Sequence, residues 1–461
     1  MKVLLINPMS TTHYQVPPLG LGYLATALEK HGHEPFIIDG QRAKTSMTDL
    51  RKAIIELKPA LVGVQAFSYD MLTAAKIITM VKRLNPTITT VIGGAHSSGV
   101  GKAIFFSLPE LDFSFRGEAE TGLSYLADFL SESGDRLDLA HIPGLMWRTE
   151  GTIQENPQAF PENLDALGFP RWDLIDPRTY PRIPQGGFYR QAPIAPIITS
   201  RGCPFPCTFC AGKTLTGRKL RMRSIEHLMA EIELLVNHFQ VRELHIVDDT
   251  FTSHKKRVHS FCEALLQKDW NLSFTMPNGV RLDTLDREVL KAMKKAGCYA
   301  LIVGIESGSQ NILDDMKKGI TLAEITEKIH LINDMGMSVR GFFIIGYPTE
   351  TFEDFQKTIR FALSLPLSGA HFSSFLPLPG SEITEQLLAE GILKNIPYES
   401  LFYSLIPLPP PGMTQKQVKK WIRKAYLRFY LRPTQMGLIL KEIHSLKLLQ
   451  ALVRRFWDYA F

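Results

Sequence analysis

Short apolar runs alternate with stretches of helical periodicity along the first 120 residues of the chain. The runs are rich in Val, Ile and Leu, as expected of strands buried on both faces. The predicted strands lie at 2–8, 34–39, 60–67, 89–96 and 111–117. The stretches between them end at Gly or Pro, which stop helices. This alternation predicts an α/β fold with a doubly wound parallel sheet, which binds ligands at the carboxyl ends of its strands.

A second alternating block begins at residue 195, again with helical stretches between apolar runs. The predicted strands lie at 195–203, 243–251, 272–281, 299–307, 339–348 and 370–380. Successive β/α units of this kind predict a TIM-like barrel or a partial barrel. A site is then expected at the carboxyl ends of its strands.

The segment between the two blocks has a different pattern. It contains a predicted hairpin that turns at Glu150–Gly151 and then a Pro-rich stretch, which together are typical of a connector. The chain is thereby divided into a sheet domain at 1–135, a linker at 136–192, a core barrel at 193–395 and a helical region at 396–461.

Charge is distributed unevenly. The net charge is +6, but the segment from Gly412 onward holds eleven Lys and Arg against two acids, so the rest of the chain is near −3. That balance argues against a nucleic-acid partner for the main body. In the basic tail, apolar and aromatic residues recur at helical spacing over 418–433. This favours helices that close the barrel; the alternative is a peripheral contact with an anionic membrane surface.

Cysteine usage and hydropathy indicate the cellular location of the protein. No apolar run reaches the roughly 18 residues of a membrane-spanning helix. Five cysteines, an odd number and mostly clustered, argue against a disulfide framework and for a reducing compartment. We expect a cytoplasmic protein, or one peripheral to the inner face of the membrane if the basic tail binds lipid.

Three of the five cysteines lie in "SRGCPFPCTFCAGK", with C-x3-C-x2-C spacing at Cys203, Cys207 and Cys210. Closely spaced thiolates bind soft metals. A zinc site needs a fourth ligand, whereas the remaining cysteines, Cys262 and Cys298, stand alone and are more typical of small buried side chains. An iron–sulfur cluster held by three protein thiolates leaves one iron open to another ligand.

This motif, with an aromatic residue before its last cysteine, resembles that of the radical S-adenosylmethionine (SAM) superfamily. The resemblance implies that Cys203, Cys207 and Cys210 hold a 4Fe–4S cluster whose fourth iron binds SAM. An electron from a donor such as flavodoxin or ferredoxin would then cleave SAM to methionine and a 5′-deoxyadenosyl radical, which takes hydrogen from an unactivated carbon.

Three further stretches match the superfamily by position: "VDDTF" (247–251), "GIESGSQ" (304–310) and "GFFIIGYPTET" (341–351). The resemblance implies SAM contacts at Phe209, Asp248, Asp249, Glu306 and Gly346. The usual Gly-Gly-Glu is replaced here by Asp248 and Asp249. Arg281, at the end of the third barrel strand, is open between carboxylate recognition and a structural ion pair.

The first domain is similar to the cobalamin-binding domain that precedes the barrel in one radical SAM subfamily. The similarity lies in "VPPLGLGYLATALEKHGHE" after the first strand, "GGAH" after the fourth and "RGEAE" after the fifth. It implies cobalamin contacts at Ser68, Gly93, Gly94, His96, Arg116 and Glu118. The D-x-H-x-x-G motif is absent, its nearest approach being Asp138-Leu-Ala-His141. A sheet that has lost the cofactor is the alternative.

These resemblances favour methylation of an unactivated carbon in a small-molecule or lipid-like substrate, with cobalamin donating the methyl group. The first alternative is a cobalamin-dependent radical cyclisation or rearrangement of tetrapyrrole or lipid type. The alternative from another class is a non-catalytic carrier of cobalamin or an iron–sulfur cluster, which would form no 5′-deoxyadenosine.

Overall fold

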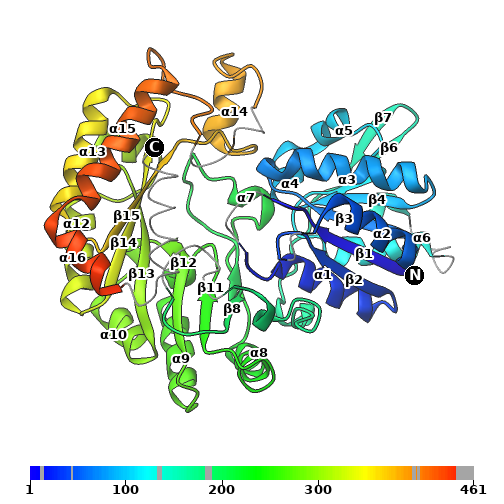
Figure 1. The fold of residues 1–461 in the computed structure, drawn as a ribbon, viewed down its shortest axis with the longest axis horizontal. Coiled ribbons are helices and arrows are strands. Elements are labelled where there is room, and N and C mark those ends of the chain that lie inside the picture. Colours follow the sequence, from blue (N-terminus) through cyan, green and yellow to red (C-terminus); the bar gives the residue numbers. More distant parts are fainter. Residues whose placement is uncertain are drawn as a thin grey trace.

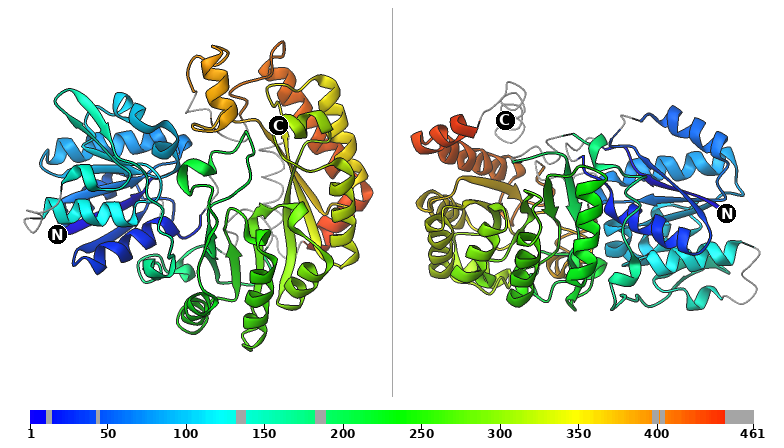
Figure 2. Two further views of the ribbon diagram at one scale, coloured as in Figure 1. Left: turned by 180° about the vertical axis from the view of Figure 1, so that it is seen from behind. Right: turned by 90° about the horizontal axis from the view of Figure 1, so that it is seen from below.

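The computed structural model describes residues 1–10, 15–42, 45–131, 138–181, 189–396, 401 and 405–442, with side chains described up to residue 437. This part of the chain folds into two α/β units that lie side by side (Figures 1 and 2). The end of the predicted basic tail and part of the Pro-rich connector lie outside the described residues.

The first unit is built on a sheet that has, within the described residues, seven strands in the order β2-β1-β3-β4-β5-β6-β7. Its strands are β1 (Lys2–Asn7), β2 (Glu34–Asp39), β3 (Leu61–Gln65), β4 (Thr89–Gly93), β5 (Phe113–Phe115), β6 (Leu145–Thr149) and β7 (Thr152–Glu155). The pairs among β1 to β5 are all parallel. The predicted parallel sheet is therefore confirmed.

Helices cover both faces of this sheet (Figure 1). They are α1 (Leu19–Lys30), α2 (Met47–Leu57), α3 (Met71–Leu84), α4 (Ala95–Val100), α5 (Ile104–Ser107) and α6 (Glu120–Leu130). In β1, Val3 and Leu5 pack into the core that contains α1 and α6, whereas Leu4 and Ile6 pack into the core that contains α2 and α3. Burial on both faces explains why β1 is uniformly apolar and does not alternate.

The predicted hairpin forms at β6 and β7, with Glu150 and Gly151 at its turn in left-handed conformation. It does not stand apart as a connector. β6 pairs antiparallel with β5, Phe113 lying opposite Trp147, so the hairpin extends the first sheet. The segment that we predict as a linker therefore begins with two strands of the first unit.

The second unit is a sheet whose described strands run in the order β15-β14-β13-β12-β11-β8, six in all, and every neighbouring pair is parallel. The strands are β8 (Ile194–Ile197), β11 (Glu243–Ile246), β12 (Ser273–Val280), β13 (Cys298–Glu306), β14 (Ser338–Ile345) and β15 (Gly369–Ser374). In the described part of the chain β8 and β15 do not pair with each other, so the barrel is partial.

Outer helices cover the barrel sheet (Figure 1). They are α8 (Ile225–Asn237), α9 (Lys255–Leu266), α10 (Arg287–Lys295), α12 (Leu322–Asp334), α13 (Phe352–Ser364) and α15 (Gln415–Tyr430). The shorter elements are α7 (Gly212–Leu215), α11 (Gln310–Asp315), α14 (Glu382–Ala389), α16 (Pro433–Glu442) and the small antiparallel pair β9 (Ser200–Arg201) and β10 (Arg221–Met222).

The open edge of β15 is covered by α15. The hydroxyl of Tyr430 donates to the carbonyl of Ala370 (2.8 Å) and accepts from its amide (3.1 Å), and the hydroxyl of Tyr426 accepts from the amide of Phe372 (3.1 Å). These bonds satisfy backbone groups that an edge strand leaves unpaired. The basic tail thus begins by closing the barrel, as we predict. No described helix is both long and apolar enough to cross a membrane.

Candidate functional site at the cysteine loop

The cysteine loop, residues 202–220, follows β8 and β9 at the carboxyl end of the barrel sheet. Pairing of β9 with β10 closes the loop at its neck, where Arg201 lies opposite Arg221. Gly202 has a φ of +92°, and a Cβ there would lie 2.2 Å from the carbonyl oxygen of Lys219, so only glycine fits. Within the loop, the amide of Cys203 donates to the carbonyl of Gly217 (3.2 Å).

The three thiols suit an anionic metal cluster. Cys203 and Cys207 are half-buried and Cys210 is exposed. Burial raises the pKa of the Cys203 thiol, and because metal binding requires thiolates, ligation and deprotonation are coupled. The guanidinium of Arg281 lies 3.7 Å from the sulfur of Cys207 and 3.7 Å from the centre of the Phe205 ring, which places a cation beside the thiols.

The spacing of the thiols differs from that of a single-ion site. Among the described residues, no three or more His, Cys, Asp or Glu side chains gather where one metal ion would bind. A 4Fe–4S cluster takes its cysteine thiolates on separate irons, and the loop offers three soft donors with a neighbouring cation. The predicted ligand set therefore fits a cluster.

Two acidic residues that follow β11, Asp248 and Asp249, accept hydrogen bonds from the cysteine loop and the residues just before it. Asp248 is buried and accepts hydrogen bonds from the amide of Thr199 (2.6 Å) and the hydroxyls of Thr199 (2.5 Å) and Ser200 (2.7 Å). Asp249 is exposed and accepts from the amide of Gly202 (3.3 Å) and the hydroxyl of Thr216 (2.7 Å). Both carboxylates thus hold the backbone that carries the cysteines; the contacts of Asp248 and Asp249 with SAM stay predictions.

A second charged pair lies on the same side of the barrel. Glu306, the last residue of β13, is buried and bonds the ammonium of Lys318 at 2.7 Å. That ammonium lies 6.0 Å from the centre of the Phe209 ring, and the carbonyl of Lys318 accepts from Arg281 at 2.7 Å. The structure therefore brings together Glu306, Phe209 and Arg281. Lys318 was missed because the turn that carries it has no motif.

Arg281 makes the structural ion pair that the sequence left open, and its recognition of a ligand carboxylate stays a prediction. It forms a structural ion pair with Asp283 (2.8 Å), and it also faces the sulfur of Cys207.

Gly346 directly follows β14 and has a φ of +94°. Its amide and that of Tyr347 donate to one carboxylate oxygen of Glu350 at 2.6 and 2.9 Å. Burial raises the pKa of Glu350 to about 8, which favours a neutral carboxyl there. Tyr347 shares a hydrogen bond of 2.9 Å with Thr208 of the cysteine loop, so this turn and the loop are joined.

The predicted contacts of the first unit fall into two groups. Ser68, Gly93, Gly94 and His96 lie together at the carboxyl ends of β3 and β4. His96 is buried, its Nδ1 lies 3.0 Å from the hydroxyl of Ser68, and burial lowers its pKa to about 4, so its ring is neutral.

Two orphaned polar atoms lie beside this first group. Oε1 of Gln65 and Oδ2 of Asp70 are buried and have no hydrogen-bond partner among the described residues. Buried polar atoms are nearly always satisfied, so this edge suits a ligand that carries polar groups, such as the amide-bearing corrin ring of cobalamin. Polar residues directly after a buried strand were the available sequence signal, but we did not single these two out.

Ionisation of Asp70 makes the folding stability of the protein depend on pH. Burial raises its pKa from 3.8 to about 6, so ionised Asp70 disfavours folding. The stability gained from its protonated form is present below about pH 4 and lost as the pH rises through about 6. Asp70→Asn is therefore expected to raise the free energy of unfolding of the cofactor-free protein relative to wild type. This gain should be larger at pH 8 than at pH 4, by at most about 3 kcal/mol.

Urea denaturation at pH 4 and pH 8 measures that difference. Asp49→Asn is the control, because Asp49 is an exposed capping residue whose pKa is lowered by hydrogen bonds from Ser46. Its removal is expected to change the pH dependence in the opposite direction. Equal pH dependence of Asp70→Asn and wild type contradicts the prediction.

The second group has protein partners already. Arg116 donates to the carbonyl of Ser98 (3.1 Å) and pairs with Glu155 of β7 (2.9 Å). Glu118 pairs with Arg201 and Arg221 of the barrel unit. The cobalamin contacts of Arg116 and Glu118 stay predictions, and their ion pairs supply a structural reason for both residues.

Two family models match the chain in the order in which the units occur. Residues 8–127 match the B12 binding domain, and residues 197–362 match the radical SAM superfamily. The first match contains the strand ends of the first unit described above, and the second contains the cysteine loop.

Relatives align over nearly the whole chain. An uncharacterized methyltransferase of Pyrococcus horikoshii is 32% identical over 94% of this chain and 93% of its own length. Cytidylyl-2-hydroxyethylphosphonate methyltransferase of Streptomyces wedmorensis is 30% identical over 87% and 84%. Anaerobic magnesium-protoporphyrin IX monomethyl ester cyclase of Rubrivivax gelatinosus is 27% identical over 90% and 74%.

The fold has a solved counterpart. The radical SAM methyltransferase TsrM from Kitasatospora setae superimposes with a TM-score of 0.69 over 84% of this chain and 76% of its own, at 23% identity. At that identity the likeness supports the shared arrangement of the two units.

Proposed function

The chain belongs to the cobalamin-binding radical SAM enzymes, and on that premise we propose that it methylates an unactivated carbon atom of a small-molecule or lipid-like substrate. Its cofactors are a 4Fe–4S cluster, SAM and cobalamin. The electron donor is proposed to be a small redox protein of the flavodoxin or ferredoxin type.

One observation carries the proposal: the cofactor-binding edges of the two units adjoin each other. Helix α4, which follows the glycine-rich turn after β4, contacts α7 of the cysteine loop. The two units also pack closely at a second place on α4, because a Cβ on Gly99 would lie 2.4 Å from the carbonyl oxygen of Pro379, which follows β15. Adjacent edges suit a reaction in which one unit activates the substrate and the other supplies a group to it.

The chain's own residues would bind and orient the cofactors. Cys203, Cys207 and Cys210 would hold the cluster, with Arg281 balancing negative charge beside Cys207. Asp249 joins the two ends of the loop and so limits its movement. When bound, the cluster supplies an electron for SAM cleavage and cobalamin supplies a methyl group. The surrounding barrel would exclude water from the reactive carbon.

The comparisons favour methylation over cyclisation. Two relatives that are at least 30% identical over most of the chain have methyltransferase names, and the cyclase is more distant at 27%. A non-catalytic carrier needs the cluster but has no need of the charged side chains that surround the cysteine loop. Arg281, Lys318 and Glu306 therefore favour an enzyme over a carrier.

Reconstitution with iron, sulfide and hydroxocobalamin under anaerobic conditions tests the proposal. The desalted protein is expected to retain corrinoid, seen in its visible spectrum, and to form 5′-deoxyadenosine and methionine from SAM after reduction with dithionite. An intact cluster without 5′-deoxyadenosine would support the carrier alternative. Loss of all corrinoid on desalting would contradict the cobalamin half of the proposal.

Methylation is tested with SAM that carries an isotope-labelled methyl group. The reduced enzyme is incubated with the lipid and soluble fractions of a cell extract, and the products are analysed by mass spectrometry. Label in an organic product supports methyl transfer. A product that forms without label supports cyclisation or rearrangement.

A further inference from the structure

A buried ionic cluster joins the two units at the neck of the cysteine loop. We call Glu118, Glu120, Arg201 and Arg221 the arginine clamp. Arg201 pairs with Glu118 (3.0 Å) and with Glu120 (2.7 Å), while Arg221 also pairs with Glu118. The four side chains are at most 8% exposed. Two positive and two negative charges thus balance one another in a largely buried place.

The two sides of the arginine clamp come from different units. Glu118 lies between β5 and α6, and Glu120 is the first residue of α6, both in the first unit. Arg201 and Arg221 are opposite residues of the β9–β10 pair in the second. Arg201 lies two residues before Cys203, so the arginine clamp is joined to the first predicted cluster ligand through Gly202 alone.

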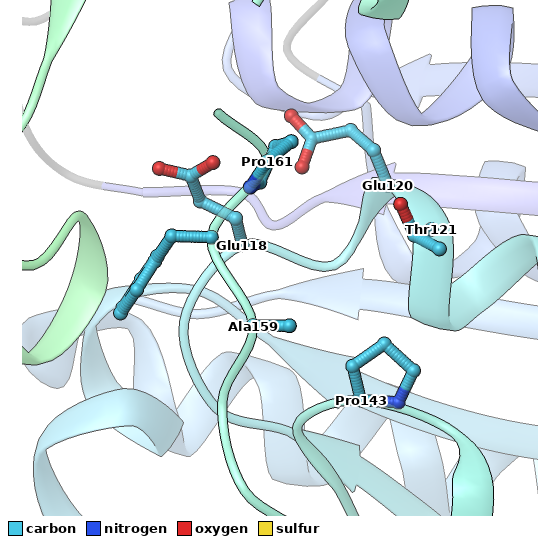
Figure 3. A pocket seen from close by; sticks show the side chains of 7 residues that line it. Glu118, Glu120, Thr121, Pro143, Ala159 and Pro161 are labelled. Atoms are coloured by element: carbon cyan, nitrogen blue, oxygen red, sulfur yellow. The ribbon is translucent and has the colours of Figure 1, made fainter. Parts of the chain in front are cut away.

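The connector between the two units also contacts Arg221 of the arginine clamp and α7 of the cysteine loop. The carbonyl of Pro161 accepts from Arg221 (2.9 Å), and the side chain of Gln158 donates to the carbonyl of Thr214 in α7 (2.8 Å). Glu118, Glu120, Ala159 and Pro161 line a small cavity of about 120 Å³, and Figure 3 shows how these side chains lie. The connector therefore fills the seam between the two units.

The far side of the loop is held by close packing. Gly99 of α4 leaves no room for a side chain against Pro379, and a Cβ on Gly380 would lie 2.6 Å from Thr214 of α7. The barrel unit is thus held to the first unit at two points: by charge at the neck of the cysteine loop, and by the packing of Gly99 in α4 against Pro379, whose neighbour Gly380 in turn packs against α7. Two separate points restrain rotation as well as distance.

A contribution to the stability of the fold does not by itself explain why the arginine clamp is present. Buried ion pairs cost desolvation energy, and apolar residues of similar volume often serve the fold equally well. Their directional bonds instead specify one relative geometry, in which a planar guanidinium meets its carboxylates in a fixed plane. In catalysis, a misplacement of about 1 Å costs on the order of 100-fold in rate.

We propose that Arg201 is a positioning residue: held by Glu118 and Glu120, it sets the position of the cluster relative to the cobalamin of the first unit. The inference rests on the proposed function, since it concerns the distance between that function's two cofactors. Glu118 then acts on the barrel unit through the arginine clamp, and its contact with cobalamin stays a prediction from the sequence.

The test uses the Glu118→Gln, Glu120→Gln double variant, which keeps the side-chain shapes and removes the negative charges. Glu162→Gln is the matched control, because Glu162 pairs with Lys219 of the same loop but both side chains are largely exposed. Iron contents are expected to equal those of wild type in both variants, since neither substitution removes a cysteine. The corrinoid content of each variant is measured as well, so that variants and wild type are compared at equal corrinoid loading.

Two measurements report the geometry. In the fully loaded, reduced protein, magnetic coupling between the cluster and cob(II)alamin depends steeply on their separation and is read from electron paramagnetic resonance spectra. We expect the coupling of the double variant to fall at least about twofold, because breaking buried pairs releases the restraint. In the cofactor-free protein, small-angle X-ray scattering is expected to give a larger radius of gyration for the double variant and a wild-type value for Glu162→Gln.

The two measurements separate the hypotheses. A wild-type radius of gyration together with wild-type coupling in the double variant overturns the positioning role. Failure of wild type to retain corrinoid contradicts the proposed function, while the scattering still decides whether the arginine clamp fixes the two units. If the double variant does not fold, Glu120→Gln replaces it, since Glu118 then still bridges both arginines. A smaller change in the same direction is expected, and no change overturns the proposal.

Discussion

Replacing Cys203, Cys207 and Cys210 together by alanine is expected to give a protein without bound iron and without the brown colour of the cluster. Wild type purified without oxygen is expected to be brown and to carry about four irons per chain. The loop supplies the soft donors of the site, and among the described residues no three His, Cys, Asp or Glu side chains gather where they could hold a single metal ion instead. Formation of 5′-deoxyadenosine from SAM is expected to fall to the level of a sample without protein.

Iron and sulfide analysis after anaerobic reconstitution measures this result. Cys262→Ala is the matched control, because Cys262 is fully buried and burial raises the pKa of its thiol to about 12, which keeps it protonated. The control is expected to retain iron and colour. A triple variant that keeps a wild-type amount of iron would contradict the assignment of the cysteine loop.

The strands could be predicted because their signal is local. β1 is apolar at every position from Val3 to Ile6, since both of its faces are buried. Among the barrel strands, β13 ends at a polar residue, Glu306, and β12 is followed by Arg281. Docking of the β6–β7 hairpin onto β5 could not be predicted in the same way. It depends on pairs such as Phe113 with Trp147, and no periodicity within either segment specifies which edge a hairpin joins.

In the candidate site, too, the features that are local in sequence could be predicted and those that depend on distant residues could not. The three cysteines lie within eight residues, so their spacing alone indicated a metal cluster. The partners of the acidic residues are distant in sequence: Asp248 bonds Thr199, 49 positions away, and Glu118 bonds Arg221, 103 positions away. Polar residues at strand ends could be recognised as candidates. Whether a carboxylate faces a ligand or another part of the chain is decided by tertiary packing.

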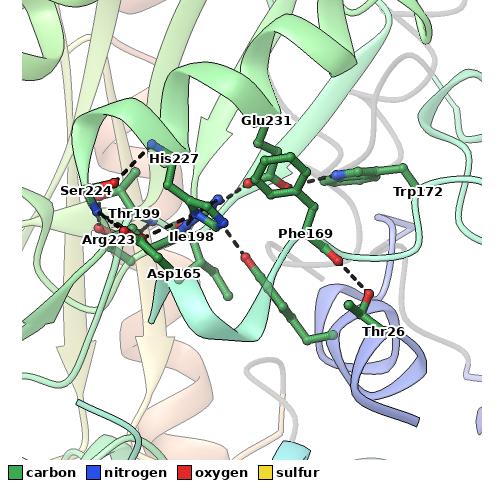
Figure 4. A network of polar contacts seen from close by, with 12 residues as sticks. Thr26, Asp165, Phe169, Trp172, Ile198, Thr199, Arg223, Ser224, His227 and Glu231 are labelled. Atoms are coloured by element: carbon green, nitrogen blue, oxygen red, sulfur yellow. Dashed lines mark hydrogen bonds and ion pairs between the residues drawn. The ribbon is translucent and has the colours of Figure 1, made fainter. Parts of the chain in front are cut away.

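Replacing Glu231 by alanine is expected to cause the largest loss of stability. Glu231 is fully buried in α8, where it pairs with Arg223 (2.5 Å) and accepts from the indole N–H of Trp172 (2.9 Å) (Figure 4). Arg223 is itself 2% exposed and also contacts the hydroxyl of Tyr23 in the first unit (3.3 Å). Removal of the carboxylate leaves a buried cation without its counter-ion and an indole donor without an acceptor. The free energy of unfolding should fall by about 3–5 kcal/mol.

Urea denaturation of the cofactor-free protein measures this loss. Glu233→Ala is the matched control on the same helix, because Glu233 and Lys268 are exposed and their charged atoms are 3.7 Å apart. An exposed pair of this kind contributes at most about 1 kcal/mol, so the control should stay close to wild type. Equal losses in the two variants would contradict the prediction.

A double variant separates the two causes of the loss. Glu231→Ala leaves both a small cavity and an uncompensated charge, whereas Glu231→Ala with Arg223→Met leaves the cavity and removes the charge. Since burying an unpaired charge costs more than losing a few methylene groups, the double variant should regain part of the stability. If it is less stable than Glu231→Ala, then the contacts of Arg223 with Tyr23 and the carbonyl of Ile198 (2.9 Å) stabilise the fold more than its charge destabilises it.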